Sequence, residues 1–303
     1  MINQVTKSRI QRLAEEYRQI IAVNREVLRE IALAEIPEMV YNSNAIENST
    51  LTLEDTEDIL LRGQIKRDHD IREIYEAKNL AKITEYLLDD SHGQLSIDLI
   101  LSLHKALLTD INDDFAGRFR YGKEWVRVGA HLGANPDFVP GLMGELVNKY
   151  NGKDDGYFLN RIAYFHAELE TIHPFCDGNG RIGRVLINQQ LQTLKLPPII
   201  IRNKSKNMDY YPLFDRYVLT TKYEGFTALF AALLTEALYR RITLLTAPKI
   251  IPLAKWAKDN GVAGNIANNK ALRQTIPAFR LRERWMIAAD YRAPLITPNC
   301  QIS

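Results

Sequence analysis

The chain has 303 residues, of which 46% are hydrophobic and 25% are charged. This composition is typical of a globular protein with room for two or three compact units. No stretch has the apolar length of a membrane span, and the N-terminus lacks the apolar run of a secretory signal. The two cysteines, Cys176 and Cys300, are too distant to indicate a disulfide framework, so we expect a protein of the reducing cytoplasm.

The formal net charge of +2 is unevenly distributed along the chain. Residues 249–292 contain nine Lys or Arg and three Asp or Glu, a net charge of +6, so the remainder carries −4. A basic C-terminal segment after a mildly acidic body indicates a polyanionic partner for that segment alone.

Most of the chain has the apolar periodicity of helices. From residue 5 to residue 33 apolar residues recur with a period near 3.6, which predicts a helix that Pro37 interrupts. Thr52 and Asp55, three positions apart, have the pattern of a capped helix start. No long alternating stretch occurs, so we predict a mainly α fold without a large sheet. Further helices are predicted at 53–61, 70–89, 96–109, 140–150, 159–171, 183–194, 208–220 and 225–246.

One stretch between the helices has a different pattern. Residues 124–128 alternate between polar and apolar, and Gly129, Gly133 and Pro136 break the chain soon afterwards. This pattern predicts a short β-hairpin, although an irregular loop fits the alternation equally well.

The most informative run is residues 173–184, His-Pro-Phe-Cys-Asp-Gly-Asn-Gly-Arg-Ile-Gly-Arg. His173 can act as a base near neutral pH, and Asp177 is a hard oxygen ligand suited to Mg²⁺. Arg181 and Arg184 lie three positions apart on one helical face and offer planar cations to phosphate oxygens. This inventory indicates a site that binds a nucleotide phosphate and moves a proton.

The glycines of this run suit an anion-binding turn. Gly178 and Gly180 lack Cβ atoms, so the backbone can approach an anion closely. The apolar residues 185–187 predict a helix that starts near Gly180, whose free N–H groups favour negative charge. The alternative is an ordinary surface turn whose arginines form ion pairs.

The run resembles the signature of the Fic family, His-Pro-Phe-x-x-Gly-Asn-Gly-Arg-x-x-Arg, at every fixed position. The resemblance implies a Fic-type helical bundle that transfers AMP from ATP to a Ser, Thr or Tyr hydroxyl of a protein. It implies His173 as the base, Asp177 as the Mg²⁺ ligand, and Arg181 and Arg184 as the residues that hold the β- and γ-phosphates. The backbone around Gly178, Asn179 and Gly180 would form the anion hole, Phe175 would anchor the loop in the core, and Cys176 would fill a variable position.

Two further stretches extend the resemblance, which covers roughly residues 40–240. The predicted hairpin lies where the family has a flap that clamps the target segment by main-chain pairing. Its Val126, Val128 and Gly129 are expected to bind ATP. Tyr210 and Tyr211 resemble a pair of tyrosines that lie near the adenine, whereas His166 is expected to be structural because it lacks companion ligands.

Residues 43–48 read Ser-Asn-Ala-Ile-Glu-Asn. Ser43 and Glu47 lie four positions apart on one helical face, and most such pairs are simply solvated. The string nevertheless resembles the inhibitory motif of Fic proteins, [Ser/Thr]-x-x-x-Glu-[Gly/Asn]. The resemblance implies that Glu47 pairs with Arg184 and occupies the guanidinium meant for the γ-phosphate of ATP.

The C-terminal segment has its own pattern. Pro248 and Pro252 mark a boundary, after which helices are predicted at 252–260 and 265–274 and a hairpin at 278–287. This order is the plan of a winged helix-turn-helix, and it resembles the small excisionase-type winged helix. Its basic charge fits DNA, and the alternatives are protein docking or oligomerisation.

We therefore expect three regions: an N-terminal helical region with the inhibitory motif at 1–95, a catalytic core at 96–246 and a winged-helix-like domain at 247–303. The function expected is a self-inhibited protein adenylyltransferase that needs ATP and Mg²⁺ and modifies an unknown protein, itself included. Two alternatives stay open. They are a phosphodiesterase that removes AMP with the same residues, and a nucleotide-sensing transcription regulator.

Overall fold

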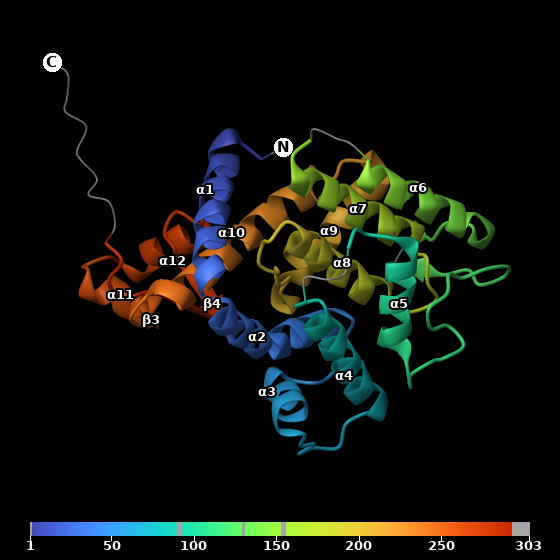
Figure 1. Ribbon diagram of the computed structural model, residues 1–303, viewed down its shortest axis with the longest axis horizontal. Coiled ribbons are helices and arrows are strands. Elements are labelled where there is room, and N and C mark those ends of the chain that lie inside the picture. Colours follow the sequence, from blue (N-terminus) through green and yellow to red (C-terminus); the bar gives the residue numbers. More distant parts are fainter. Residues whose placement is uncertain (1, 90–92, 129–130, 153–155, 293–303) are drawn as a thin grey trace.

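The computed structural model describes residues 2–89, 93–128, 131–152 and 156–292, and it is mainly helical (Figure 1). The N-terminal elements are α1 (Gln4–Val23), α2 (Arg25–Ile46), α3 (Leu53–Glu57), the π-helical turn η1 (Asp58–Arg62) and α4 (Ile71–Tyr86). The central elements are α5 (Ile97–Leu108), β1 (Arg127–Val128), β2 (His131–Leu132), η2 (Pro136–Phe138), α6 (Val139–Asn151), α7 (Phe158–Ile172) and α8 (Asn179–Thr193). The later elements are η3 (Asn203–Ser205), η4 (Lys206–Tyr210), α9 (Tyr211–Thr220), α10 (Glu224–Thr246), β3 (Ile250–Pro252), α11 (Leu253–Asp259), α12 (Gly264–Leu272), β4 (Phe279–Leu281) and β5 (Arg284–Ala288).

Helices α7 and α8 lie at the centre because both bury more than one face. Phe165 and Leu169 of α7 belong to a core shared with α4, α5 and α6, whereas Leu159 and Ile162 of the same helix belong to a second core shared with α1, α9 and α10. Helix α8 divides its apolar residues between the same two cores. The loop that joins α7 to α8, which carries the predicted signature, is therefore held between two rigid helices.

The N-terminal prediction is wrong in two respects. The helix predicted over 5–33 is two helices, because Asn24 leaves the helical conformation (φ −126°, ψ 38°) and its side chain donates to the Ile20 carbonyl. Pro37 does not interrupt α2, which runs through it to Ile46. Pro37 is buried and Val40 belongs to the core, so tertiary packing compensates for the hydrogen bond that a helical proline loses.

Other sequence predictions are confirmed. The Thr52 hydroxyl accepts from the Asp55 N–H at 3.1 Å and the Asp55 carboxylate accepts from the Thr52 N–H at 3.1 Å, which is a reciprocal cap. The helices predicted at 70–89, 96–109, 140–150, 159–171 and 225–246 correspond to α4, α5, α6, α7 and α10. The helix predicted from 208 begins as an α-helix only at Tyr211, since a π-helical turn precedes it.

The hairpin is present rather than an irregular loop. β1 pairs with β2 in antiparallel register, with Arg127 opposite Leu132 and Val128 opposite His131. Gly129, an expected site residue, lies outside the described residues. In the part of the chain that the structure describes, no helix is both long and apolar enough to cross a membrane.

Residues after α10 build a small module with its own core. Helices α11 and α12 pack against a sheet of strand order β3-β5-β4, and Trp256 is almost fully buried between them. Figure 1 places this module at one end of the molecule, opposite α5 and α6. Its hairpin tip contacts the body: Arg282 pairs with Glu57 at 2.8 Å, and Glu283 pairs with Lys204. The predicted basic segment is thus docked rather than a free tail.

Candidate active site

His173 caps the C-terminus of α7 in the left-handed conformation (φ 53°, ψ 64°), which few residues other than glycine adopt. Arg120 stabilises this turn. Its guanidinium is fully buried and donates to the carbonyl of His173 at 2.7 Å and to that of Ile172 at 3.0 Å. Sequence reasoning did not assign this role to Arg120, because its partners lie more than fifty positions away. The strained turn aims His173 out of the helix.

The hydrogen bonds of His173 define its tautomer. Nδ1 lies 3.2 Å from the carbonyl oxygen of Glu170, which can only accept, so Nδ1 carries the proton and Nε2 is left as an acceptor. Burial is the main cause that lowers the pKa of His173 to about 4; Arg120 acts in the same direction, and the Glu170 carbonyl and the Glu47 carboxylate oppose it. The imidazole is therefore neutral at pH 7 and can take a proton through Nε2.

The signature loop is rigid because two side chains hold it from within. Phe175 is fully buried and stacks on His104 with ring centroids 3.7 Å apart. The Asn179 side chain accepts from the Phe175 N–H at 2.9 Å and donates to the Phe175 carbonyl at 2.8 Å. The side chain of Asn179, which was expected to bind the nucleotide, instead forms hydrogen bonds with the backbone of the loop. Only the backbone N–H of Asn179 is left to bind an anion.

Gly178 makes the start of α8 possible. Its φ is +79°, and a Cβ would lie 3.0 Å from Leu107 in α5, so a side chain there would be both strained and crowded. The first hydrogen bond of the helix runs from Ile182 to the Gly178 carbonyl. The N–H groups of residues 179–181 therefore have no partner within the helix and form an anion-binding N-terminus.

Asp177 and Arg181 belong to a cluster of four charges. The Asp177 carboxylate accepts from Arg181 at 2.9 Å and also contacts Arg72 of α4. Glu76, one turn along α4, pairs with Arg181 at 2.9 Å and with Arg72 at 3.0 Å. Burial would raise the pKa of Asp177, but the two arginines outweigh it and hold that pKa below its usual range. Arg72 and Glu76 were not singled out from the sequence, where they form only an ordinary pair four residues apart.

Arg184 is bound by the end of α2, as expected. It donates to the Ser43 hydroxyl at 3.0 Å, to the Ser43 carbonyl at 2.9 Å and to the Glu47 carboxylate at 2.7 Å. Glu47 also packs on the backbone of Gly180, where a Cβ would lie 2.2 Å from its Oε1. Burial would raise the pKa of Glu47, yet Arg184 outweighs this and lowers it, so the pair is ionised at neutral pH.

A polar cavity of about 420 Å³ lies between the end of α2, helix α4 and the signature loop. Of the expected site residues, His173, Asp177, Gly178, Asn179, Arg181 and Glu47 line it. Its described lining residues do not include the other expected site residues Ser43, Val126, Gly180, Arg184, Tyr210 and Tyr211, and nothing is described of the Val128 side chain. Tyr210 is buried, with its hydroxyl 2.7 Å from His166 Nε2, which agrees with a structural role for His166. The Tyr211 hydroxyl donates to the Ile46 carbonyl at 2.8 Å, at the end of α2.

Comparison with known proteins identifies the class. Residues 94–191 match the Fic/DOC family, so this part of the chain is a Fic/DOC domain. Its solved neighbours include a Fic domain containing signaling protein from Bacteroides thetaiotaomicron (TM-score 0.71, 23% identity, 78% of this chain and 96% of that chain). A Fic family protein from Desulfovibrio desulfuricans has a TM-score of 0.62 at 21% identity over 97% of this chain and 98% of that chain. These likenesses show the fold.

Curated relatives match more than half of the chain. Protein adenylyltransferase fic-1 of Caenorhabditis elegans is 32% identical over 178 residues, which are 57% of this chain and 34% of the relative. Protein adenylyltransferase Fic of Nematostella vectensis is 31% identical over 182 residues, or 58% of this chain and 42% of the relative. The chain therefore spans less than half the length of these relatives.

Proposed function

We propose that this protein is an adenylyltransferase that moves AMP from ATP to a Ser, Thr or Tyr hydroxyl of a protein, and that α2 restrains it. The observation that carries the proposal is the position of His173, whose Nδ1 faces the Glu170 carbonyl, beside the N-terminus of α8 in one cavity. The names of the curated relatives support the same activity. The target protein is not identified by these features.

The roles follow from the chemistry of each group. His173 takes the proton of the attacking hydroxyl. The N–H groups at the start of α8 bind phosphate oxygens as negative charge develops on them. Arg181 and Arg184 hold the outer phosphates, and this positions the α-phosphorus for in-line attack.

The residues of the cavity fit Mg²⁺ only together with a nucleotide. Among the described residues, no group of three His, Cys, Asp or Glu could hold a metal alone. Protein Mg²⁺ sites typically use one or two carboxylates with substrate phosphates, and Asp177 supplies one such carboxylate. Arg72 would have to release Asp177 for this. Bound Mg²⁺ would offset phosphate charge.

Restraint by α2 follows from competition for one guanidinium. While Arg184 binds Ser43 and Glu47, it cannot hold the γ-phosphate. ATP then binds with its triphosphate displaced, and a displacement of about 1 Å can cost roughly 100-fold in rate. Glu47 is thus the residue whose removal should release the activity.

Mass spectrometry of the protein incubated with ATP and Mg²⁺ tests the proposal. We expect Glu47→Gly to gain one or more AMP adducts, on itself or on an added protein lysate, and the Glu47→Gly/His173→Ala double variant to gain none. No adduct in either preparation would contradict AMP transfer, and equal adducts in both would remove His173 from the base role.

For the C-terminal module we propose contact with DNA through α12. Its exposed face carries Asn265, Asn268 and Asn269, with Arg273 exposed at its C-cap, and amides of this kind pair with adenine edges in the major groove. The hairpin tip contacts the body, so α12 is the surface that supports this proposal. Fluorescence anisotropy with a random DNA duplex should reveal salt-dependent binding that Arg273→Ala weakens. Absence of binding at low salt would contradict contact with DNA.

We propose the reducing cytoplasm as the compartment of this protein, because its two cysteines are far apart in the sequence.

A further inference from the structure

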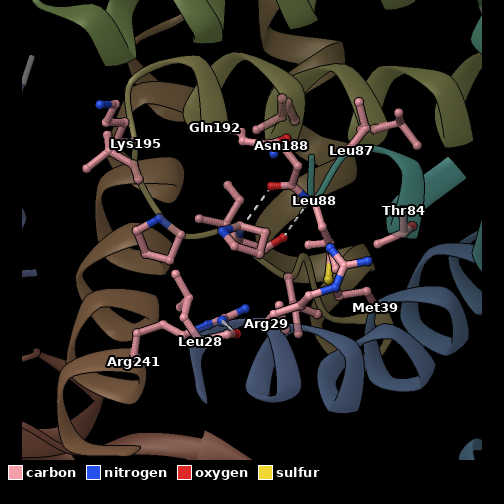
Figure 2. Close-up of a pocket in the computed structure, with 18 of the residues that line it drawn as sticks. Leu28, Arg29, Met39, Thr84, Leu87, Leu88, Asn188, Gln192, Lys195 and Arg241 are labelled. Atoms are coloured by element: carbon pink, nitrogen blue, oxygen red, sulfur yellow. Dashed lines mark hydrogen bonds between the residues drawn. The ribbon is translucent and has the colours of Figure 1, made fainter. Parts of the chain in front are cut away.

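A second cavity lies on the opposite side of the contact between α2 and α8. It has a volume of about 510 Å³, within the range of about 300–1,000 Å³ that small-molecule sites occupy. Figure 2 shows Asn188 and Gln192 of α8 facing Leu28 and Arg29 of α2 across it, with Leu87 and Leu88 after α4 closing one side. Helix α1 and residues 195–201 complete the wall.

The interior of this second cavity is apolar and its walls are fixed. Leu80, Leu87, Ile187, Leu196 and Ile199 line it and are each at most 6% exposed. The segment 195–201 is fixed to α8 by a pair of hydrogen bonds between the Asn188 amide and the backbone of Ile199, at 2.9 and 3.1 Å. The space is therefore a formed site rather than a gap between loose loops.

The charge on the lining is of one sign. The described lining residues include no Asp or Glu, and the cationic ones are Arg18, Arg25, Arg29, Arg184, Lys195 and Arg241. Arg29 pairs with Asp89, Arg241 with Glu35 and Arg184 with Glu47, all of them acids outside the lining. Arg25 and Lys195 are exposed and have no acidic partner among the described residues. An apolar interior with unpaired cations at its opening is complementary to an amphipathic anion.

We propose that this cavity binds an amphipathic carboxylate, a molecule with an aliphatic body and one anionic head. The body would lie on the apolar wall between α4 and α8, and the head would lie near Arg25 and Lys195. Phosphate or another small anion has no apolar part to bury here, and a neutral hydrocarbon would form no ion pair with Arg25 or Lys195.

The second cavity also reaches the inhibitory contact. The residues that α2 contributes to it follow one helical face that begins at Arg25 and ends at Ser43, and α8 contributes Arg184. A ligand that fits this space binds the arrangement in which α2 lies against α8, and so favours it over any other. Occupancy should therefore stabilise the Ser43–Arg184 contact. Ligand binding in this cavity does not depend on the proposed function. Only a resulting decrease in AMP transfer would rest on it.

Isothermal titration calorimetry with decanoate tests the site without ATP. We expect decanoate to bind the full chain, and decylamine, of equal length and opposite charge, not to bind. Arg25→Ala/Lys195→Ala should weaken decanoate binding by roughly three- to tenfold, because both cations are exposed. Arg12→Ala, which removes an exposed cation of α1 outside the lining, is the matched control and should change nothing.

A filling variant and a structural readout complete the test. Met39→Trp places a ring in the cavity and should abolish binding, with circular dichroism as the check that the helices persist. Hydrogen exchange in residues 39–46 should slow when decanoate is saturating, in wild type but not in Met39→Trp. Absence of heat, equal binding of decylamine, or an unchanged affinity in the Arg25→Ala/Lys195→Ala variant would overturn the site. Unchanged exchange with decanoate bound would overturn the link to α2. If decanoate binds while Glu47→Gly gains no AMP, the proposed function fails and the site stands.

Discussion

The two sides of the α2–α8 contact are built differently. On the catalytic side, charges neutralise one another: Asp177 and Glu76 pair with Arg181, and Glu47 pairs with Arg184. On the reverse side, apolar side chains surround a cavity whose opening has cations without acids among the described residues. Charge pairs can be exchanged for phosphate contacts at little cost in packing, whereas an apolar wall resists rearrangement. The comparison teaches that one face of α8 can switch ligands while the other keeps the fold.

The largest expected effect breaks the charge pairing on the catalytic side. Glu47→Gly should raise the initial rate of AMP transfer by up to roughly 100-fold, since Arg184 becomes available to the γ-phosphate. Labelled ATP measures the rate, and urea denaturation should show a loss of stability, because Arg184, whose side chain is only 8% exposed, keeps only its hydrogen bonds to Ser43. Ser43→Ala is the matched comparison and should release less activity, because Glu47 stays in place. Equal rates in wild type and Glu47→Gly would contradict the proposal that α2 restrains AMP transfer.

A second prediction concerns pH. In Glu47→Gly the rate should stay flat from about pH 5 to 8, because protonation of His173 stops proton transfer only below its pKa of about 4. The Glu47 carboxylate raises the pKa of His173 in the intact protein, so the loss of Glu47 should lower the pKa of His173 further. A pH–rate profile of kcat checks this. An acid limb centred near pH 6.5, the value of a free imidazole, would contradict the burial argument.

The third prediction separates positioning from binding in the signature loop. Asn179→Ala should lower the free energy of unfolding by about 1–3 kcal/mol, because the Phe175 N–H and carbonyl lose their partner in a buried place. Urea denaturation measures the change, and Asn188→Ala, at the reverse side of the same helix, should act similarly on the segment at Ile199. A loss of ATP affinity with unchanged stability would instead assign the Asn179 amide to the nucleotide.

The smallest effect is expected at the surface. Arg282→Ala removes the ion pair with Glu57, in which the arginine side chain is 66% exposed, and should cost less than about 1 kcal/mol. Thermal unfolding in low and high salt checks this, because screening should remove most of the difference. A larger loss would mean that the docked hairpin supports the N-terminal helices more strongly than a surface pair can.

Sequence and structure agree where a pattern is local. The signature 173–184 predicted a turn followed by a helix, which the structure confirms, and the Ser43–Glu47 spacing with its family resemblance led to the contact with Arg184. The roles of the signature residues stay predictions. The cap at Thr52 was predictable because its two partners are three positions apart. The break at Asn24 and the passage of α2 through Pro37 were not, since packing against distant helices decided them.

The sequence by itself determined which candidate site residues stand close together, because His173, the glycines, Arg181 and Arg184 lie within one loop and the first turns of one helix. Only the tertiary structure decided how they are used. It assigned the Asn179 amide to the loop, Arg120 to the His173 turn and Arg72 to Asp177, and it formed the second cavity. The physical reason is that these contacts join residues far apart in the chain, whose meeting depends on how two cores place α7 and α8.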